Sequence, residues 1–210
     1  MSERKGSTGV LVIDPYNDFL SEGGKLWPHL RAVAEDVSLI DNLVDILAEA
    51  RRSGIPVFYA PHHRAEPGDL STWTHANPYQ LASSEMQVFA KESWGGTFRQ
   101  EFLPQPADIV AREHWSASGF ANTDLDHQLR QRGIDKLIVV GVLANTCVES
   151  TARSAVDLGY HVTLITDATA AFTDEAMRAA HDLNGPTYAH TVATTKELLH
   201  TLQQKGSPDV

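Results

Sequence analysis

The stretch KLIVVGVLANTCVEST (136–151) changes character in its middle. Residues 136–142 are almost wholly apolar, which is typical of a central strand that helices cover on both faces. From about residue 145 the spacing of apolar residues is that of a helix. The only cysteine of the chain, Cys147, lies at this junction. The stretch therefore predicts a β-strand that leads directly into a helix, with a thiol in the first helical turn.

Similar strand-helix units recur on both sides of this stretch. Short β-branched runs predict further strands at 9–14, 55–60, 107–112, 161–168 and, more weakly, 190–195, and helical periodicity marks 36–53, 122–133, 147–158 and 173–183. Asn122 or Thr123 is the expected N-cap of the second of these helices, and Gly133 its terminator. This alternation predicts an α/β fold: a three-layer αβα, Rossmann-like, doubly wound sheet of about six mostly parallel strands. Right-handed crossovers would wind it in both directions from the first strand.

The domain organisation follows from length and composition. With 210 residues, 42% of them hydrophobic, and no break in composition, we expect a single domain over 1–210. Residues 61–106 are rich in Gly, Pro, Trp and His with weak periodicity, so they are expected to form an elaborated loop region above the sheet edge.

Charge and cysteine content restrict the partners and the compartment. The net charge of -10 and the absence of a Lys/Arg cluster argue against a nucleic acid or an anionic membrane as partner, and no apolar run is long enough to span a bilayer. A lone cysteine forms no intrachain disulfide, and the N-terminal residues lack the apolar core of a signal peptide. We therefore expect a cytoplasmic protein that acts on a small molecule.

Reactive side chains follow the predicted strands at their carboxyl ends, where ligands bind in such sheets. Asp14 follows the first strand, His62 the second, Glu113 and His114 the third, and Cys147 the fourth. For any single one of them, a helix cap or a solvent-facing polar residue is an equally good interpretation. Their number favours a site.

Cys147 is the sharpest candidate. In the first turn of a helix, free N–H groups and the helix dipole would lower the pKa of the thiol and could also bind the oxygen of a tetrahedral intermediate. The alternative is a small buried hydrophobic residue, the commoner fate of a lone cysteine. Asp14 could be the base that accepts and returns the thiol proton, or only a turn residue before Pro15.

The segments VIDPYNDF (12–19) and SGFANTDLDHQLRQRGIDKLIVVGVLANTCVESTARSAVDLGYHVTLITDATAA (118–171) resemble the isochorismatase-like cysteine hydrolase superfamily, which includes nicotinamidases and N-carbamoyl amide hydrolases. The resemblance implies an Asp, Lys, Cys triad, with Asp14 as general base and Cys147 as nucleophile. It also implies a non-proline cis peptide around Val142–Leu143 and an oxyanion hole formed by the backbone N–H groups of Leu143 and Cys147.

The triad lysine is missing. The segment DIVAREHWSASGF (108–120) contains none. Counting forward from Asp108 puts Glu113 in its place, and counting back from Ser118 puts His114 there. His114 is the better candidate, because a protonated imidazole can replace the lysine charge if its neighbours raise its pKa, whereas a glutamate cannot. Arg112 is a third possibility, although strand alternation would point it away from the side of Glu113.

Around the catalytic candidates, we expect the substrate-binding side chains to be Phe19, His62, Trp94 and Trp115, although the aromatic residues could equally pack in the core or at a subunit interface. Some relatives bind a zinc-type ion through an Asp-x-His and a later His. Here Pro61 stands in place of that Asp, so His62, His63, Asp69 and His75 are not expected to bind a metal, and no cofactor is expected. The resemblance further implies a homodimer or homotetramer.

These observations favour a hydrolase that cleaves the C–N bond of a small amide or carbamoyl compound through a thioester on Cys147. Two alternatives remain. One is an enol-ether hydrolase of the isochorismatase type, which would use acid catalysis by Asp14. The other is a non-catalytic, thiol-bearing binding protein, because a fold does not guarantee a reaction.

Overall fold

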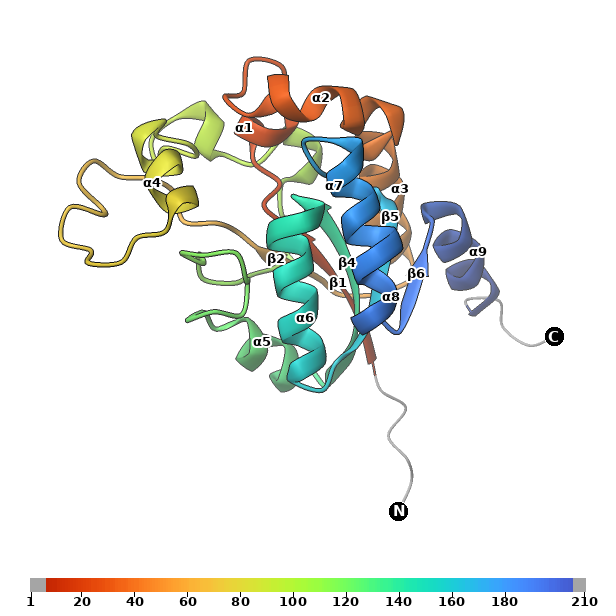
Figure 1. Cartoon of the computed structure of the whole chain (residues 1–210). Helices are drawn as coiled ribbons and strands as arrows, with labels where there is room; N and C mark the ends of the chain where they lie inside the picture. Colours follow the sequence, from red (N-terminus) through yellow and green to blue (C-terminus); the bar gives the residue numbers. More distant parts are fainter. Residues whose placement is uncertain (1–6, 206–210) are drawn as a thin grey trace.

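The computed structural model describes residues 7–205 and contains one parallel sheet in the order β3-β2-β1-β4-β5-β6 (Figure 1). The strands are β1 (Ser7–Ile13), β2 (Val57–Ala60), β3 (Ile109–Val110), β4 (Ile134–Val142), β5 (His161–Ala170) and β6 (Thr191–Ala193). Every pairing is parallel, and the order runs outward in both directions from β1 and β4. The predicted doubly wound α/β fold is confirmed.

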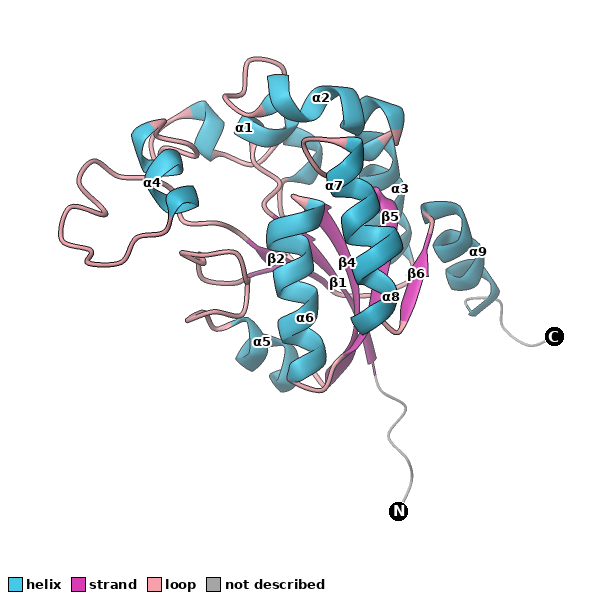
Figure 2. Cartoon of the chain, viewed as in Figure 1, coloured by secondary structure: helices cyan, strands magenta, loops and turns pink. Residues whose placement is uncertain are grey.

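Helices cover both faces of the sheet (Figure 2). One face packs against α2 (Trp27–Asp36), α3 (Leu39–Arg52) and α9 (Thr195–Lys205), and the other against α5 (Leu125–Gln131) and α6 (Glu149–Asp157). The segment α7 (Asp174–Arg178), η4 (Ala179–Asn184) and α8 (Gly185–Tyr188) runs beside α6. No helix within residues 7–205 is long and apolar enough to cross a membrane.

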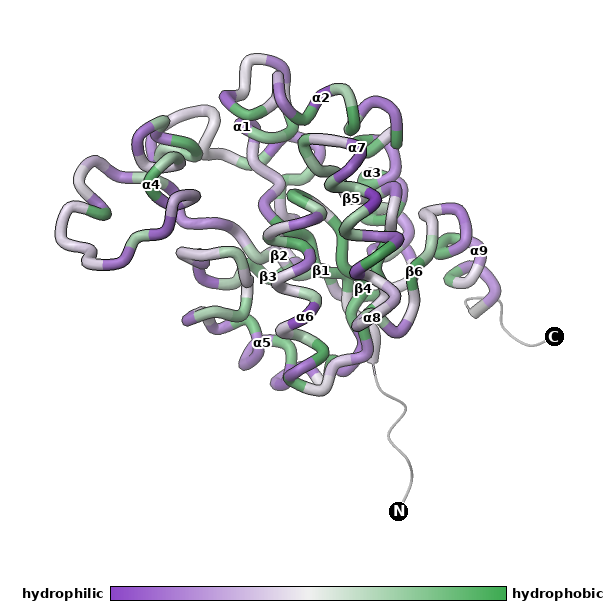
Figure 3. Tube along the Cα trace, viewed as in Figure 1, coloured by the Kyte–Doolittle hydropathy of each residue, from purple (hydrophilic) through white to green (hydrophobic). Residues whose placement is uncertain are grey.

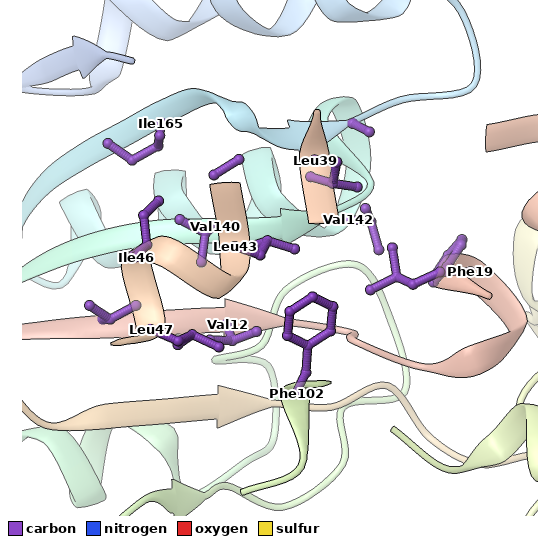
Figure 4. Packing of buried hydrophobic residues seen from close by; sticks show 14 of the residues in the cluster. Val12, Phe19, Leu39, Leu43, Ile46, Leu47, Phe102, Val140, Val142 and Ile165 are labelled. Atoms are coloured by element: carbon purple, nitrogen blue, oxygen red, sulfur yellow. The ribbon is translucent and has the colours of Figure 1, made fainter. Parts of the chain in front are cut away.

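Alternation along the central strands explains the two cores. Val10 and Val12 of β1 pack with α3, whereas Leu11 and Ile13 point to the opposite face and pack with α5 and α6. Because successive side chains of a strand point to opposite faces, a continuous apolar run fills both cores at once. The hydropathy of the chain follows this plan, with the apolar residues concentrated in the sheet (Figure 3). Figure 4 shows the first core, where Leu43 and Leu47 of α3 lie against Val12 and Val140.

Several element boundaries differ from the predictions. The third strand, expected over 107–112, is reduced to Ile109–Val110, and the helix expected from 36 begins at Leu39, after the unpredicted α2. The helix after residue 122 begins only at Leu125; neither expected residue is its N-cap, which is Asp124. The final helix α9 was not predicted either. Amphipathic surface helices with ordinary spacing are weak signals beside the apolar strands.

Residues 61–106 contain few helices and no strand of the sheet. They contain α4 (Pro78–Glu85), the two 3-10 turns η1 (Trp94–Gly96) and η2 (Gln100–Phe102), and a long loop before α4 that extends away from the sheet (Figure 1). Together with the short α1 (Asn17–Leu20), they form the walls above the carboxyl edge of β1 and β2.

Candidate active site

The carboxyl ends of the three central strands lie level with one another. Ile13, the last residue of β1, pairs with Ala60 of β2 and with Gly141 of β4. A side chain at Gly141 is impossible without movement, because a Cβ there would lie 2.2 Å from the carbonyl oxygen of Ile13 and its φ is +114°. The close approach of β1 and β4 at this point brings Asp14, fully buried, to the edge from which the Cys147 turn departs.

A local bulge decides which residue reaches Asp14 from the third strand. The N–H of Ala111 donates to the carbonyl of Tyr59, so a regular ladder would pair the N–H of Glu113 with the carbonyl of Pro61. The structure instead pairs the N–H of His114 with Pro61, at 2.9 Å. One extra residue is therefore accommodated between Ala111 and His114, which is the definition of a bulge.

As a result, His114 points into the site. Its ring is fully buried, and its Nε2 lies 3.1 Å from Oδ1 of Asp14. Its Nδ1 is hydrogen-bonded to the carbonyl oxygen of Ser116. Burial opposes the charged ring, but the carboxylate of Asp14 and the carbonyl acceptors outweigh it and raise the pKa of His114 above its ordinary value. Both ring nitrogens face acceptors, which is the arrangement that an imidazolium requires.

Glu113 and Arg112 lie outside this centre, which corrects the expectation that Glu113 belongs to the catalytic group. The carboxylate of Glu113 accepts hydrogen bonds from the backbone N–H and from Nε of Arg64, and its Oε2 lies 3.3 Å from Nδ1 of His63. Although burial acts in the opposite direction, these partners lower the pKa of Glu113 to about 2. Arg112 is exposed, and its backbone N–H donates to Asp124.

Cys147 lies in a π-helical turn, η3 (Ala144–Val148), that follows β4 and continues into α6. The peptide bond Val142–Leu143 is cis, as the resemblance implied. The N–H groups of Thr146 and Val148 both donate to the carbonyl oxygen of Leu143, at 3.1 Å each. Cys147 is the residue between these two in the chain. The backbone of Leu143 lies close enough to the sulfur of Cys147 to lower the pKa of the thiol.

The predicted low pKa of the thiol is wrong. Cys147 is only 1% exposed, and burial is the largest cause that raises its pKa well above the ordinary value. The nearby charge of Asp14 raises the pKa further, and the hydroxyl of Thr146 and the backbone of Leu143 offset this only in part. Desolvation and a neighbouring carboxylate outweigh the dipole of a single turn. The resting group is therefore a thiol beside a carboxylate.

The segment that follows His114 is tied to the helix that follows Cys147. The N–H of Gly119 donates to the hydroxyl of Thr151 at 2.8 Å, and the hydroxyls of Ser118 and Ser154 lie 2.9 Å apart. A Cβ at Gly119 would lie 2.8 Å from that of Ala60, so only glycine allows this packing. These contacts fix the position of His114 relative to α6.

Two further side chains complete the centre. The ring of His62, 6% exposed, lies edge-on to His114 at a centroid distance of 5.1 Å; burial lowers its pKa, and its Nε2 has no partner among the described residues. Tyr79 of α4 was missed in the sequence. Burial, then the charges of Cys147 and Asp14, raise the pKa of its hydroxyl, and the centroid of its ring lies 6.0 Å from that of His62.

A sequence signal for Tyr79 did exist. Asn77 and Gln80 form a capping box with Pro78 in the first turn, and this signature predicts a helix start inside the irregular region. It would have placed Tyr79 in the first turn of a helix, but it could not have shown that this turn lies over Cys147.

The expected substrate-binding residues lie in different places. Phe19 is buried and lines a cavity of about 460 Å³ that is also lined by Tyr79 and Phe172. His62 and Trp115 line a separate space of about 30 Å³, where Trp115 stacks on His63 at 3.4 Å between ring centroids. Trp94 is 54% exposed on η1 and lines neither cavity.

Nothing in the described part of the chain gathers metal ligands. No group of three or more His, Cys, Asp and Glu side chains within residues 7–205 is placed to hold a metal ion. His63 is hydrogen-bonded to Asp69 at 2.7 Å, and His75 is exposed on the loop before α4.

Comparison with known proteins identifies the family and several relatives of this chain. A family model described as the isochorismatase domain matches residues 8–207. The chain is similar to the ureidoacrylate amidohydrolase RutB of Pseudomonas syringae pv. syringae, with 31% identity over 98% of this chain and 87% of the relative. It is also similar to RutB of Caulobacter segnis, with 32% identity over 94% of this chain and 87% of the relative.

Two solved hydrolase structures are also similar to this chain. An N-carbamoylsarcosine amidase from Thermoplasma acidophilum superposes with a TM-score of 0.68 and 27% identity, over 90% of this chain and 96% of that one. A cysteine hydrolase from Pseudomonas syringae pv. phaseolicola superposes with a TM-score of 0.77 and 25% identity, over 97% of this chain and 99% of that one.

Proposed function

Because the chain belongs to the isochorismatase family, we propose that it hydrolyses the C–N bond of a small amide or carbamoyl compound through a thioester on Cys147. At the level of enzyme class, it is an isochorismatase-family hydrolase that acts on C–N bonds. The thioester mechanism and the roles of individual residues are the finer part of the proposal.

One observation supports this mechanism above the others: the buried Asp14 carboxylate binds His114 through one oxygen and keeps the other oxygen free of partners within residues 7–205. Its Oδ1 accepts from Nε2 of His114, whereas its Oδ2 is buried and has no hydrogen-bond partner among the described residues. A buried, unpaired carboxylate oxygen is costly unless it has a use. Beside a thiol whose proton it can accept, it is suited to proton transfer.

In the acylation step, Asp14 takes the proton of the Cys147 thiol, and the sulfur attacks the carbonyl carbon of the amide. The oxygen of the tetrahedral intermediate becomes negative and is stabilised by the N–H groups of Leu143 and Cys147. The C–N bond then breaks, and Asp14 gives the proton to the departing nitrogen, which leaves a thioester on Cys147.

In the second step, Asp14 takes a proton from a water molecule, whose oxygen attacks the thioester carbonyl. The C–S bond breaks, the acid is released, and the proton returns to the sulfur. His114 holds Asp14 in place throughout, and its positive charge stabilises the thiolate that forms when Asp14 takes the proton. In this role it replaces the lysine of the family pattern.

The test is a set of small primary amides and N-carbamoyl compounds, assayed for ammonia release, with intact-mass detection of an acyl adduct. We expect turnover by the wild type, an adduct on the only cysteine, and loss of both in Cys147→Ala. Glu113→Gln, outside the centre, is the control that should keep its activity.

Two results would contradict the mechanism. Full amide hydrolysis by Cys147→Ala would exclude the thiol nucleophile. Hydrolysis of an isochorismate-like enol ether that survives in Cys147→Ala but not in Asp14→Asn would instead assign the site to acid catalysis by Asp14.

A further inference from the structure

The cavity of about 460 Å³ that Tyr79 lines has mostly apolar walls. Its size is in the range of small-molecule sites. Its walls include Phe19, Leu26, Met86, Val88 and Phe172, and none of the residues that line it is Lys, Arg, Asp or Glu. The only ionisable nitrogen among them is that of His29, which is exposed.

This pocket adjoins the catalytic centre through one side chain. Tyr79 lines the pocket, and the centroid of its ring lies 6.0 Å from that of His62, which in turn lies 5.1 Å from that of His114. The opposite wall, Phe172, follows β5, whose last residue Ala170 pairs with Val142 directly before the Cys147 turn. A group attached to an amide at the sulfur therefore has this apolar space within reach, past the ring of Tyr79.

The cationic side chain beside the pocket is already occupied. The ammonium group of Lys25, next to Leu26 in the chain, donates to the carbonyl oxygens of Met86 and Gln87, at 3.0 and 2.5 Å. It caps the end of α4 and is not part of the lining. A carboxylate placed against the apolar walls of the pocket would lose part of its hydration without gaining the charge of Lys25, which is unfavourable.

From this lining we infer that the substrate is a neutral amide or ureido compound with an apolar substituent, and that the pocket excludes substrates carrying a second, anionic group. This rests on the proposed function and adds the substrate class. It separates the chain from the relatives whose names specify ureidoacrylate or carbamoylsarcosine, both of which are carboxylic acids.

The test compares matched pairs that differ only in charge. Hexanamide against adipamate places the substituent on the acyl side, and N-propylurea against N-carbamoyl-β-alanine places it on the nitrogen side; in each pair a terminal methyl replaces the carboxylate. We expect kcat/KM to favour a neutral member at least tenfold, and to rise about fourfold for each methylene added to the preferred series until the pocket is full.

Charge reversal inside the pocket gives a second readout. Met86→Arg places a cation at the pocket and should narrow or reverse the preference for the neutral member. Leu81→Arg is the matched control, because Leu81 is an exposed residue of α4, whose C-cap is Met86, and does not line the pocket; it should leave the preference unchanged.

The two levels of the proposal can fail separately. Preference for the anionic members, or no dependence on chain length, would overturn the inferred substrate class while leaving the thioester mechanism intact. If the wild type hydrolyses no member, the proposed function fails, and calorimetric titration of Cys147→Ala with hexanamide and adipamate decides the pocket. Tighter binding of hexanamide supports the inference, and equal, weaker or undetectable binding overturns it.

Discussion

Replacing Asp14 with asparagine should make the thiol more acidic while abolishing turnover. In the wild type, burial raises the pKa of Cys147, and the charge of the Asp14 carboxylate raises it further. Asparagine keeps the shape of the side chain but removes the charge. The thiolate then no longer forms beside a negative charge, so the pKa of the Cys147 thiol falls.

The size of the change follows from the charge interaction. Two unit charges about 4 Å apart repel by about 4 kcal/mol at an effective dielectric constant of about 20, which corresponds to about three pKa units. His114 offsets part of this repulsion in the wild type, because its Nε2 lies 3.1 Å from Asp14. We therefore expect the pKa of Cys147 to fall by about one to three units in Asp14→Asn.

The chain contains a single cysteine, so alkylation by iodoacetamide followed by intact mass reports this thiol alone. We expect the wild-type rate to keep rising with pH beyond the free-thiol pKa of about 8.5, and that of Asp14→Asn to level off at lower pH. Its amide hydrolysis should fall by about 10²- to 10⁴-fold, because the general base is gone.

The control is Asp135→Asn, an exposed carboxylate near the opposite end of β4, which should change neither curve. An unchanged or higher pKa of the thiol in Asp14→Asn would refute the conclusion that Asp14 holds Cys147 in its protonated form. A low wild-type pKa would refute the dominance of burial over the helix turn.

Three further outcomes test the remaining geometry. Since the pKa of His114 is raised, its charge is present below that pKa, and wild-type kcat/KM should fall as the pH rises through it. His114→Lys should move this fall in kcat/KM to higher pH. His114→Gln should lower the activity by at least about tenfold at every pH. Because the pKa of Glu113 is lowered to about 2, its contribution to stability is present above its ordinary pKa of about 4.5 and is lost as the pH falls towards 2. The melting temperature of Glu113→Gln, followed by circular dichroism, should therefore lie below that of the wild type at pH 7 and converge with it in acid. A difference in melting temperature that stays constant with pH would contradict this. Gly141→Ala should destabilise the protein by about 3 kcal/mol or more in urea unfolding, because the new Cβ would meet the carbonyl of Ile13; a loss below about 1 kcal/mol would show that β1 and β4 can separate.

The lysine of the family pattern is missing from residues 108–120, and this changes how a positive charge at the site is held. A lysine carries its charge at any pH below its high pKa, whereas the charge of His114 depends on Asp14 and on the acceptors at both ring nitrogens. In the proposed mechanism, the charge of Asp14 raises the pKa of both the imidazole and the thiol. This coupling makes the pH profile the most informative measurement on the enzyme.

The sequence by itself determined the strand order and two of the site residues. Apolar runs buried on both faces are unmistakable, and right-handed crossovers leave few ways to connect them, so the doubly wound sheet followed. Asp14 and Cys147 could be named because each directly follows such a run, and the carboxyl ends of parallel strands meet at one edge. Both facts are local in the chain.

Only the tertiary structure decided the rest. Whether Glu113 or His114 enters the site depends on one extra residue in a ladder to β2, and a shift by one residue reverses the direction of every side chain beyond it. The direction of the pKa shift of Cys147 depends on burial and on Asp14, which is distant in the sequence. Tyr79 reaches the thiol because a surface helix folds back over the sheet edge. Periodicity records which face of its own element a residue occupies, but not which charges and walls the fold brings against it.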